Sequence, residues 1–282
     1  MILQDIKRKF RLSDAFEDWE DYRQLLTGMV IDAGGGDKIK TVTVFGAGYC
    51  NDIDINTLSS YFKDVALLDC DFEALTKVKN GPGEEEAKNI KLIQASLTGI
   101  DESDISVFFD ETLAELQRYG KLLTRQCFEE VIMTNLDKLL SKIYTAEDEI
   151  LKVLPRTDIA VCNGVCSQLF SIVSYFISSV AASIPDALFT GAFDVADKAE
   201  QKLKKCNDVI VPMIVNATMK VTGDCVIFGN EYIKDHPVEG AYQCINAVQK
   251  SGSKIKELEA KWNFNRKENI VYNMLLQVCQ GI

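Results

Sequence analysis

The stretch "TVTVFGAGYCNDIDINTLSSYF", from Thr41 to Phe62, constrains the fold more than any other part of the chain. Its β-branched start predicts a buried strand, Gly46 and Gly48 predict a tight turn, and the remainder has a helical pattern. A strand that passes through glycines directly into a helix presents backbone N–H groups at the carboxyl edge of a sheet, where ligands bind. One glycine permits the sharp turn, and the other lets a ligand approach the backbone.

Strand and helix patterns alternate after this stretch. Four further apolar runs, "VALLDCD", "IKLIQASL", "TDIAVCNG" and "GDCVIFGN", are nearly continuous, as is typical of parallel strands covered on both faces. The segment from 251 to 280 predicts two strands around "NFNRKEN", which we interpret as an antiparallel pair at the edge of the sheet. The pattern therefore predicts one α/β domain with helical additions.

Two regions lie outside the strand and helix alternation. Residues 1–40 predict an N-terminal helical segment with an apolar stripe formed by Phe16, Trp19, Tyr22, Leu25 and Leu26. Trp19 and Tyr22 fit either the packing core or a lid in which Tyr22 closes a pocket. Residues 41–282 form the α/β domain, and a run of helix formers without proline predicts a helical insertion at about 107–154.

The composition limits which binding partners and which cellular compartment we expect for the protein. A formal net charge of -11 disfavours nucleic acid and anionic membrane surfaces, because both are bound largely through Lys and Arg, and a small-molecule substrate fits better. Nine cysteines without a C-x-x-C pair indicate a reducing cytoplasm and no metal site. The most apolar stretch, "VCSQLFSIVSYFISSVAASIPDALF", contains many serines and is broken by Pro185, which indicates a buried helix rather than a membrane span.

The glycine turn and a following acid narrow the choice of ligand. A dinucleotide site requires a third glycine where this chain has Asn51, which weakens the case for NAD. Asp69 ends the next strand, 23 residues after Gly46, at about the spacing at which an acid accepts hydrogen bonds from a ribose diol. The pair favours an adenosine-containing ligand without a pyrophosphate. The glycines of "IDAGGGD" precede a strand and are interpreted as a linker.

Five motifs resemble a known family. "VFGAGYCND", "LLDCDFEAL", "QASLTGI", "DIAVCNGVCSQL" and "GDCVIFGNEY" follow the order of the strand-end motifs of class I S-adenosylmethionine-dependent methyltransferases, over about residues 41–280. The resemblance implies a Rossmann-like three-layer αβα sandwich with a seven-stranded, mostly parallel sheet whose last strand is antiparallel. It also implies S-adenosylmethionine as the methyl donor.

The same resemblance implies which residues contact the cofactor. The expected set is Gly46, Ala47, Gly48, Asn51, Asp69, Cys70, Ser96, Leu97, Asn163 and Gly164. The glycine turn would lie beside the amino-acid part of the donor, and Asp69 would bind the ribose hydroxyls. Ser96 and Leu97 would contact the adenine, although family members often carry Asp where this chain has Ser96. Asn163 and Gly164 would line the region near the sulfonium.

Candidates for the acceptor side follow the fourth and fifth strands. His236, which is the single histidine, and Glu231 are candidates for a general base, with an ordinary loop position as the alternative. Substrate contacts are expected from four residues, Tyr22, Cys166, Gln168 and Tyr232. Cys166 is not expected to be a nucleophile, because no base is identifiable beside it. Asp71 and Glu73 are interpreted as first-turn acids of a helix.

These observations predict an enzyme that transfers a methyl group from S-adenosylmethionine to a small-molecule acceptor by in-line displacement. Positioning would supply most of the rate, since the methyl group already sits on a positive sulfur. Two alternatives remain open at this stage: a non-catalytic protein that binds the nucleoside, and an NAD-dependent oxidoreductase. Labelled-methyl transfer and tight NADH binding distinguish them.

Overall fold

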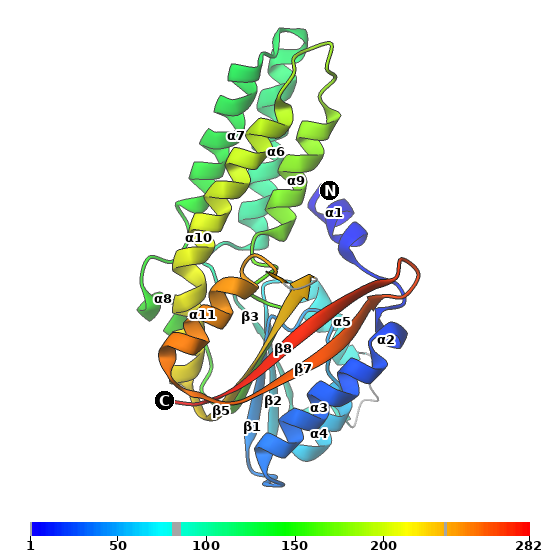
Figure 1. Cartoon of the computed structure of the whole chain (residues 1–282), viewed down its shortest axis with the longest axis vertical. Coiled ribbons are helices and arrows are strands. Elements are labelled where there is room, and N and C mark those ends of the chain that lie inside the picture. The colour runs from blue at the N-terminus through cyan, green and yellow to red at the C-terminus, as the bar shows by residue number, and fades with distance from the viewer. Residues whose placement is uncertain (1, 81–85, 234–235) are drawn as a thin grey trace.

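A twisted sheet forms the centre of the molecule in the computed structural model, which describes residues 2–80, 86–233 and 236–282 (Figure 1). Its strands are β1 (Thr41–Phe45), β2 (Asp64–Asp69), β3 (Ile90–Gln94), β4 (Thr157–Asn163), β5 (Thr222–Ile233), β6 (His236–Pro237), β7 (Lys254–Asn265) and β8 (Ile270–Gln280). The order is β3-β2-β1-β4-β5-β8-β7, and the two-residue β6 pairs with β5. The predicted α/β fold with a seven-stranded main sheet is confirmed.

Strand direction places the carboxyl ends of five strands at one edge. β1 pairs in parallel with β2 and β4, so that Val42 lies opposite Val65 and Ile159. β8 runs antiparallel to β5 and β7 and lies between them, with Cys225 opposite Gln280. The predicted antiparallel pair at the edge of the sheet, with the last strand reversed, is therefore confirmed. The strand order changes direction at β1, and such a switch point opens a crevice at the carboxyl edge.

Alternate residues of each strand face the two covering layers. Val42 and Val44 of β1 join the core under α3 (Glu20–Gly34) and α4 (Ile55–Tyr61), whereas Phe45 joins the opposite core. That second core contains residues of α10 (Ala192–Val221) and α11 (Ala241–Ser251), both of which contact β5. A further helix, α5 (Phe72–Asn80), packs on β2 and β3. The sheet is thus the middle layer of a three-layer sandwich (Figure 1).

The N-terminal segment contains two helices before α3. These are α1 (Ile2–Phe10) and α2 (Ala15–Asp18), and Trp19 separates α2 from α3. The expected single apolar stripe is divided by this break. Tyr22 and Leu26 are buried, whereas Phe16 is 57% exposed and Leu25 is 36% exposed. The regular three- and four-residue spacing therefore overstated the apolar face, because Leu25 of α3 and Phe16 of α2 lie at its exposed margin.

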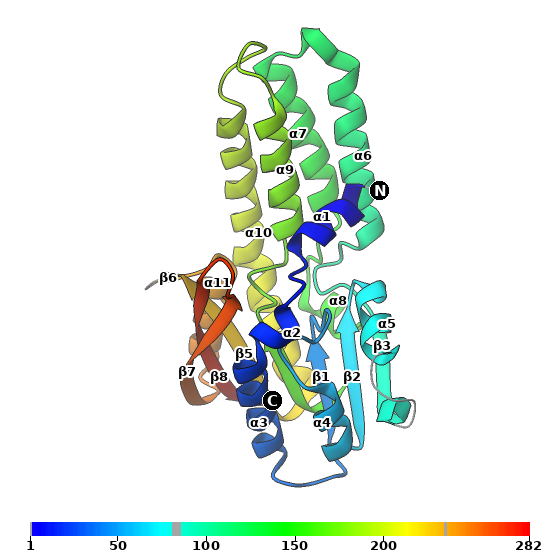
Figure 2. The same ribbon diagram turned by 90° about the vertical axis from the view of Figure 1, so that its right-hand side faces the viewer.

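A bundle of four helices extends from one end of the sheet (Figure 2). Its members are α6 (Glu102–Tyr119), α7 (Arg125–Leu140), α9 (Ser171–Ser183) and α10. The rings of Phe109 and Phe176 stack in its core with centroids 4.0 Å apart. The expected insertion at about 107–154 covers most of α6 and all of α7, whereas α9 and α10 follow β4. The shorter helices are α8 (Glu147–Leu151) and the 3₁₀ turns η1 (Glu86–Asn89) and η2 (Gly120–Leu122).

The longest helix of the described ranges, α10, contains Pro212 and continues past it. A proline inside a helix removes one backbone hydrogen bond and costs about 3 kcal/mol. Val211 and Ile214 beside it are fully buried, so packing against the bundle and the sheet outweighs that cost. Within the described ranges no helix combines the length and apolar character that a bilayer crossing requires.

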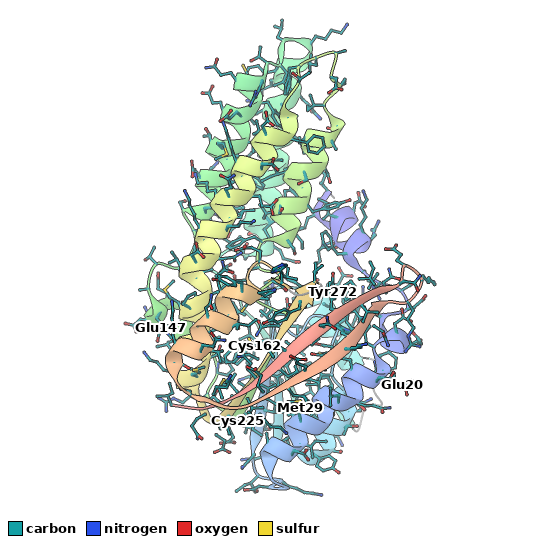
Figure 3. All side chains as sticks on the ribbon, viewed as in Figure 1. Glu20, Met29, Glu147, Cys162, Cys225 and Tyr272 are labelled. Atoms are coloured by element: carbon teal, nitrogen blue, oxygen red, sulfur yellow. The ribbon has the colours of Figure 1, made fainter. Side chains whose placement is uncertain are left out.

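The two ends of the sheet differ in what surrounds them. Tyr272 on β8 lies toward the end nearer the bundle, and Cys225 on β5 lies at the opposite end (Figure 3). Cys162 is buried in the core that the sheet forms with α10 and α11. All nine cysteines of the chain fall in the described part and are free thiols.

Candidate functional site

A cavity of about 360 Å³ opens at the carboxyl ends of β1 to β4, beneath the N-terminal helices. Its lining includes all ten residues that the sequence assigns to the cofactor and one of those assigned to the acceptor, Gln168. Its volume lies within the range of about 300–1,000 Å³ that is typical of small-molecule sites. The strand-end motifs, which are far apart in the chain, therefore meet around a single space.

The glycine turn adopts a conformation that suits glycine for two different reasons. Gly46 has a φ of +63°, and a Cβ there would lie 2.5 Å from Cγ2 of Val165. Gly48 has a φ of +50° and no atom within 4 Å of its Cβ position, so this side of the turn is open to a ligand. Cys50 also has a positive φ, 52°, which the sequence analysis did not anticipate. The turn is therefore held partly by a strained non-glycine residue.

Asp69 at the end of β2 connects the turn to the next helix. Its Oδ2 accepts a hydrogen bond from the Gly48 N–H at 2.8 Å, and its Oδ1 accepts one from the Asp71 N–H at 2.7 Å. Burial raises the pKa of Asp69 above its usual value. Asp71 in turn accepts a hydrogen bond from the Ala74 N–H and caps α5, as expected of a first-turn acid. Glu73 forms an exposed ion pair with Lys77.

Ser96 shapes the turn that follows β3. Its hydroxyl oxygen accepts hydrogen bonds from the N–H groups of Thr98, at 3.2 Å, and Gly99, at 3.1 Å. A serine is suited to such a local turn. Leu97, which also lines the cavity, is 7% exposed. At this position, where the sequence analysis notes that members of the similar family often have Asp, Ser96 therefore stabilises the turn after β3.

Asn163 at the end of β4 is held by polar contacts on both sides. The Tyr22 hydroxyl donates to Asn163 Oδ1 at 2.6 Å, and Asn163 Nδ2 donates to Asp52 Oδ2 at 2.5 Å. Gly229 makes room for this side chain, because a Cβ there would lie 1.9 Å from Asn163 Oδ1. Tyr22 itself is buried at 2% exposure and does not line the cavity, but it contacts two residues that do, Asn163 through this hydrogen bond and Trp262 through ring stacking.

Glu231 lies directly behind the cavity wall at Gly164. A Cβ on Gly164 would be 2.9 Å from Glu231 Oε1, and the same oxygen accepts a hydrogen bond from the Ser167 hydroxyl at 2.8 Å. Burial raises the pKa of Glu231 to about 6. The carboxylate therefore backs the cavity without lining it.

Three other residues expected near the acceptor are not part of the cavity lining. His236 is exposed on β6, and Tyr232 is partly exposed near the end of β5. Cys166 is buried, and a hydrogen bond to Cys244 together with burial raises the pKa of its thiol well above the usual value. A thiol with so high a pKa is not a nucleophile near neutral pH.

The N-terminal segment supplies lining residues that the sequence analysis did not assign. These are Leu3, Lys7, Phe10, Arg11, Leu12, Ala15 and Trp19. Lys7 Nζ lies 2.5 Å from both Asp71 Oδ2 and Glu102 Oε1, which joins α1 to the sheet edge and to α6. The amphipathic pattern of "ILQDIKRKF" predicts a helix, but it carries no information on which surface that helix covers.

The C-terminal hairpin encloses the other side of the cavity. Trp262 and Phe264 of β7 belong to the lining, and the Trp19 indole N–H donates to the Phe264 carbonyl at 2.9 Å. The Arg266 N–H donates to Asp18 at 3.0 Å, which fixes α2 against the hairpin. The N-terminal segment is thus attached to the domain at both ends of its path across the cavity.

Comparisons with known proteins yield structural neighbours only. No family model and no curated protein matches the sequence. The magnesium protoporphyrin IX methyltransferase ChlM from Synechocystis PCC 6803 with bound SAM has 9% identity and a TM-score of 0.47, covering 96% of this chain and 85% of its own. The proposed RNA methyltransferase PH1948 from Pyrococcus horikoshii has 12% identity and a TM-score of 0.46, covering 92% and 80%.

A third neighbour, the YcgJ protein from Bacillus subtilis, has 10% identity and a TM-score of 0.44, covering 92% of this chain and 98% of its own. One of the names specifies magnesium protoporphyrin IX and another RNA. The strand order, with a reversed β8 between β5 and β7, is the Rossmann-like arrangement of a mostly parallel seven-stranded sheet that the sequence predicts.

Proposed function

We propose that the chain binds S-adenosylmethionine in this cavity and transfers its methyl group to a small-molecule acceptor. The observation that carries the proposal is the convergence of the glycine turn, Asp69, the Ser96 turn and Asn163 on one cavity. The open side of Gly48 suits the amino-acid part of the donor, and we assign to Asp69, which lines the cavity beside this turn, the hydrogen bonds from the ribose hydroxyls. The lining thus offers contacts along the length of one nucleoside.

When bound, the donor supplies a methyl group on a positive sulfur, which a nucleophile displaces in line. The chain's own contribution is to fix the donor and acceptor in that alignment and to exclude water. Trp19, Trp262 and Phe264 provide an apolar wall for this purpose. Since His236 lies outside the lining and Gly164 separates Glu231 from the cavity, we assign proton transfer to neither of them.

Two features support a small acceptor over a macromolecule. The N-terminal helices cover the cavity and are joined to the domain through Lys7 and Trp19, so access is restricted. The net charge of -11 opposes the phosphate backbone of RNA. A pocket that is buried beneath a covering segment suits a ligand that can be enclosed entirely.

The test has a binding step and a transfer step. Both tryptophans of the chain line the cavity, so S-adenosylhomocysteine binding should change the intrinsic fluorescence. Labelled S-adenosylmethionine is then incubated with the protein and with separate small-molecule and macromolecular fractions of a cell extract. The proposal expects label in the small-molecule fraction. Label in RNA alone would replace the acceptor assignment, and binding without transfer would identify a nucleoside-binding protein.

A further inference from the structure

Asp52 lies on the cavity wall at the end of a chain of hydrogen bonds. Its Oδ2 accepts from Asn163 Nδ2, and Asn163 Oδ1 accepts from the Tyr22 hydroxyl. An ionised carboxylate can only accept, so the Asn163 amide has one permitted orientation. Tyr22 is held in place by Trp262, whose ring stacks on it with centroids 5.1 Å apart and an interplanar angle of 16°. Asp52 is therefore fixed in one position.

No basic group among the described residues forms a salt bridge with Asp52. Its partner is the neutral amide of Asn163. Arg23 is the cation that acts on it, but the Arg23 guanidinium donates to the carbonyls of Phe16, at 2.6 Å, and Asn51, at 2.9 Å. Burial of a carboxylate without a cationic partner is unfavourable, and a positive ligand would offset that cost.

Glu231 adds an independent second negative group at the same end of the cavity. It is 6% exposed, and its Oε2 has no hydrogen-bond partner among the described residues. Its other oxygen lies immediately behind Gly164, which lines the cavity. A buried polar atom without a partner is unusual in a folded protein. The carboxylate of Glu231 is therefore incompletely compensated within the protein, and its negative charge acts on the cavity from behind Gly164.

Aromatic faces complete this region. The rings of Trp19 and Trp262 meet edge to face, with centroids 4.6 Å apart, and both residues line the cavity. Tryptophan faces attract cations through the ring quadrupole. A half-buried carboxylate and two tryptophan rings in the lining of one cavity suit an organic cation and oppose an anion.

We propose that Asp52 is the charge-selective residue of the cavity and holds the positive sulfonium end of the donor. This inference rests on the proposed function. During transfer the methyl carbon forms a bond to the acceptor and its bond to sulfur breaks. The sulfur keeps that electron pair and becomes a neutral thioether. The attraction to Asp52 therefore exists for S-adenosylmethionine and is lost for S-adenosylhomocysteine, which favours exchange of product for donor.

The test measures three affinities by calorimetry, for S-adenosylmethionine, S-adenosylhomocysteine and sinefungin, whose amine replaces the sulfonium. Asp52→Asn preserves the shape and can still accept from Asn163. It should weaken both cationic ligands by about tenfold or more and change S-adenosylhomocysteine by less than about threefold. An equal loss for all three would overturn the proposal, because Asp52 would then only support the turn.

Two further variants separate the possible causes. Asp69→Asn is the matched control, and it should weaken all three ligands alike because each carries the same ribose diol. Glu231→Gln removes the second charge and should again weaken the cationic pair selectively, which keeps the proposal testable if Asp52→Asn does not fold. If the unaltered protein binds none of the three ligands, the proposed function fails and the charge selectivity is rejected with it.

Discussion

The carboxylate of Asp69 accepts a hydrogen bond from the backbone N–H of Gly48 at 2.8 Å, so the acid that ends β2 is joined directly to the turn that follows β1. A second bond, from the Asp71 N–H, fixes the other oxygen of the carboxylate. The acid thus orients the turn before any ligand is bound. The two halves of the proposed nucleoside site are coupled through one side chain.

Replacing Asp69 with Ala should weaken binding of S-adenosylhomocysteine by about 1–3 kcal/mol, because both the diol contact and the support of the turn are lost. Calorimetric titration measures this change. Glu73→Ala is the control, since Glu73 is exposed and its one ion pair among the described residues is with Lys77. Equal affinities for the Asp69 variant and the unaltered protein would contradict the assignment.

Alanine substitutions at Gly46 and Gly48 should separate stability from binding. At Gly46 the new Cβ would collide with Val165 at 2.5 Å, so the variant should unfold at a lower denaturant concentration. At Gly48 the Cβ would point into open space, so stability should fall by only about 1 kcal/mol from the left-handed backbone. Ligand affinity should nevertheless fall, because the Cβ occupies the ligand's side of the turn. Urea unfolding measures the stability of each variant, and calorimetry measures its ligand affinity. Equal losses of stability in the Gly46 and Gly48 variants would contradict this prediction.

The ion pairs of Lys7 predict slower ligand release than an uncovered site would show. Lys7→Gln removes the link from α1 to Asp71 and Glu102 and leaves two acids close together. S-adenosylhomocysteine should then dissociate about tenfold faster, as stopped-flow tryptophan fluorescence can record. Arg8→Gln is a matched control on the same helix, since Arg8 is exposed and, within the part of the chain that the structure describes, pairs with Asp5 alone. An unchanged dissociation rate in the Lys7 variant would show that α1 does not act as a lid.

Glu231 predicts a pH dependence of stability. Burial raises its pKa from 4.5 to about 6, so folding favours the protonated form. The stabilisation is complete below pH 4.5 and is lost as the pH rises through about 6. Between these limits the unaltered protein should lose about 2 kcal/mol relative to Glu231→Gln, which does not titrate. Urea unfolding at several pH values measures the difference, and parallel curves for the two proteins would be the contrary result.

The part of the site that could be predicted from sequence is local in the chain. Gly46, Gly48 and Asp69 stand on a strand, a turn and the next strand, and parallel pairing brings such segments together by a general rule. The strands were predictable because runs such as "TDIAVCNG" are apolar on both faces and occur between helices. These features depend on short-range pattern alone.

The remaining site residues come from segments whose packing position cannot be predicted from the local sequence pattern. Trp262 belongs to a strand that joins the sheet only through β8, and Lys7 belongs to a helix that crosses the cavity. Whether an amphipathic helix covers a site or a plain core depends on the shape of the surface that it meets. The role of Asp52 could not be predicted for a related reason. Its position on the cavity wall depends on a hydrogen bond from the side chain of Asn163, which is more than a hundred residues away in the sequence.

The position of β8 has a consequence for how the chain acquires its structure during synthesis. In the described sheet, β7 has β8 as its single neighbouring strand, yet β8 is made after it. β7 therefore cannot join the sheet, and Trp262 on β7 cannot reach its place at the cavity, until the residues of β8 have left the ribosome. The ligand-binding end of the protein should therefore mature only after β8 has been made, and ligand added to stalled nascent chains should protect them from protease only once β8 has emerged.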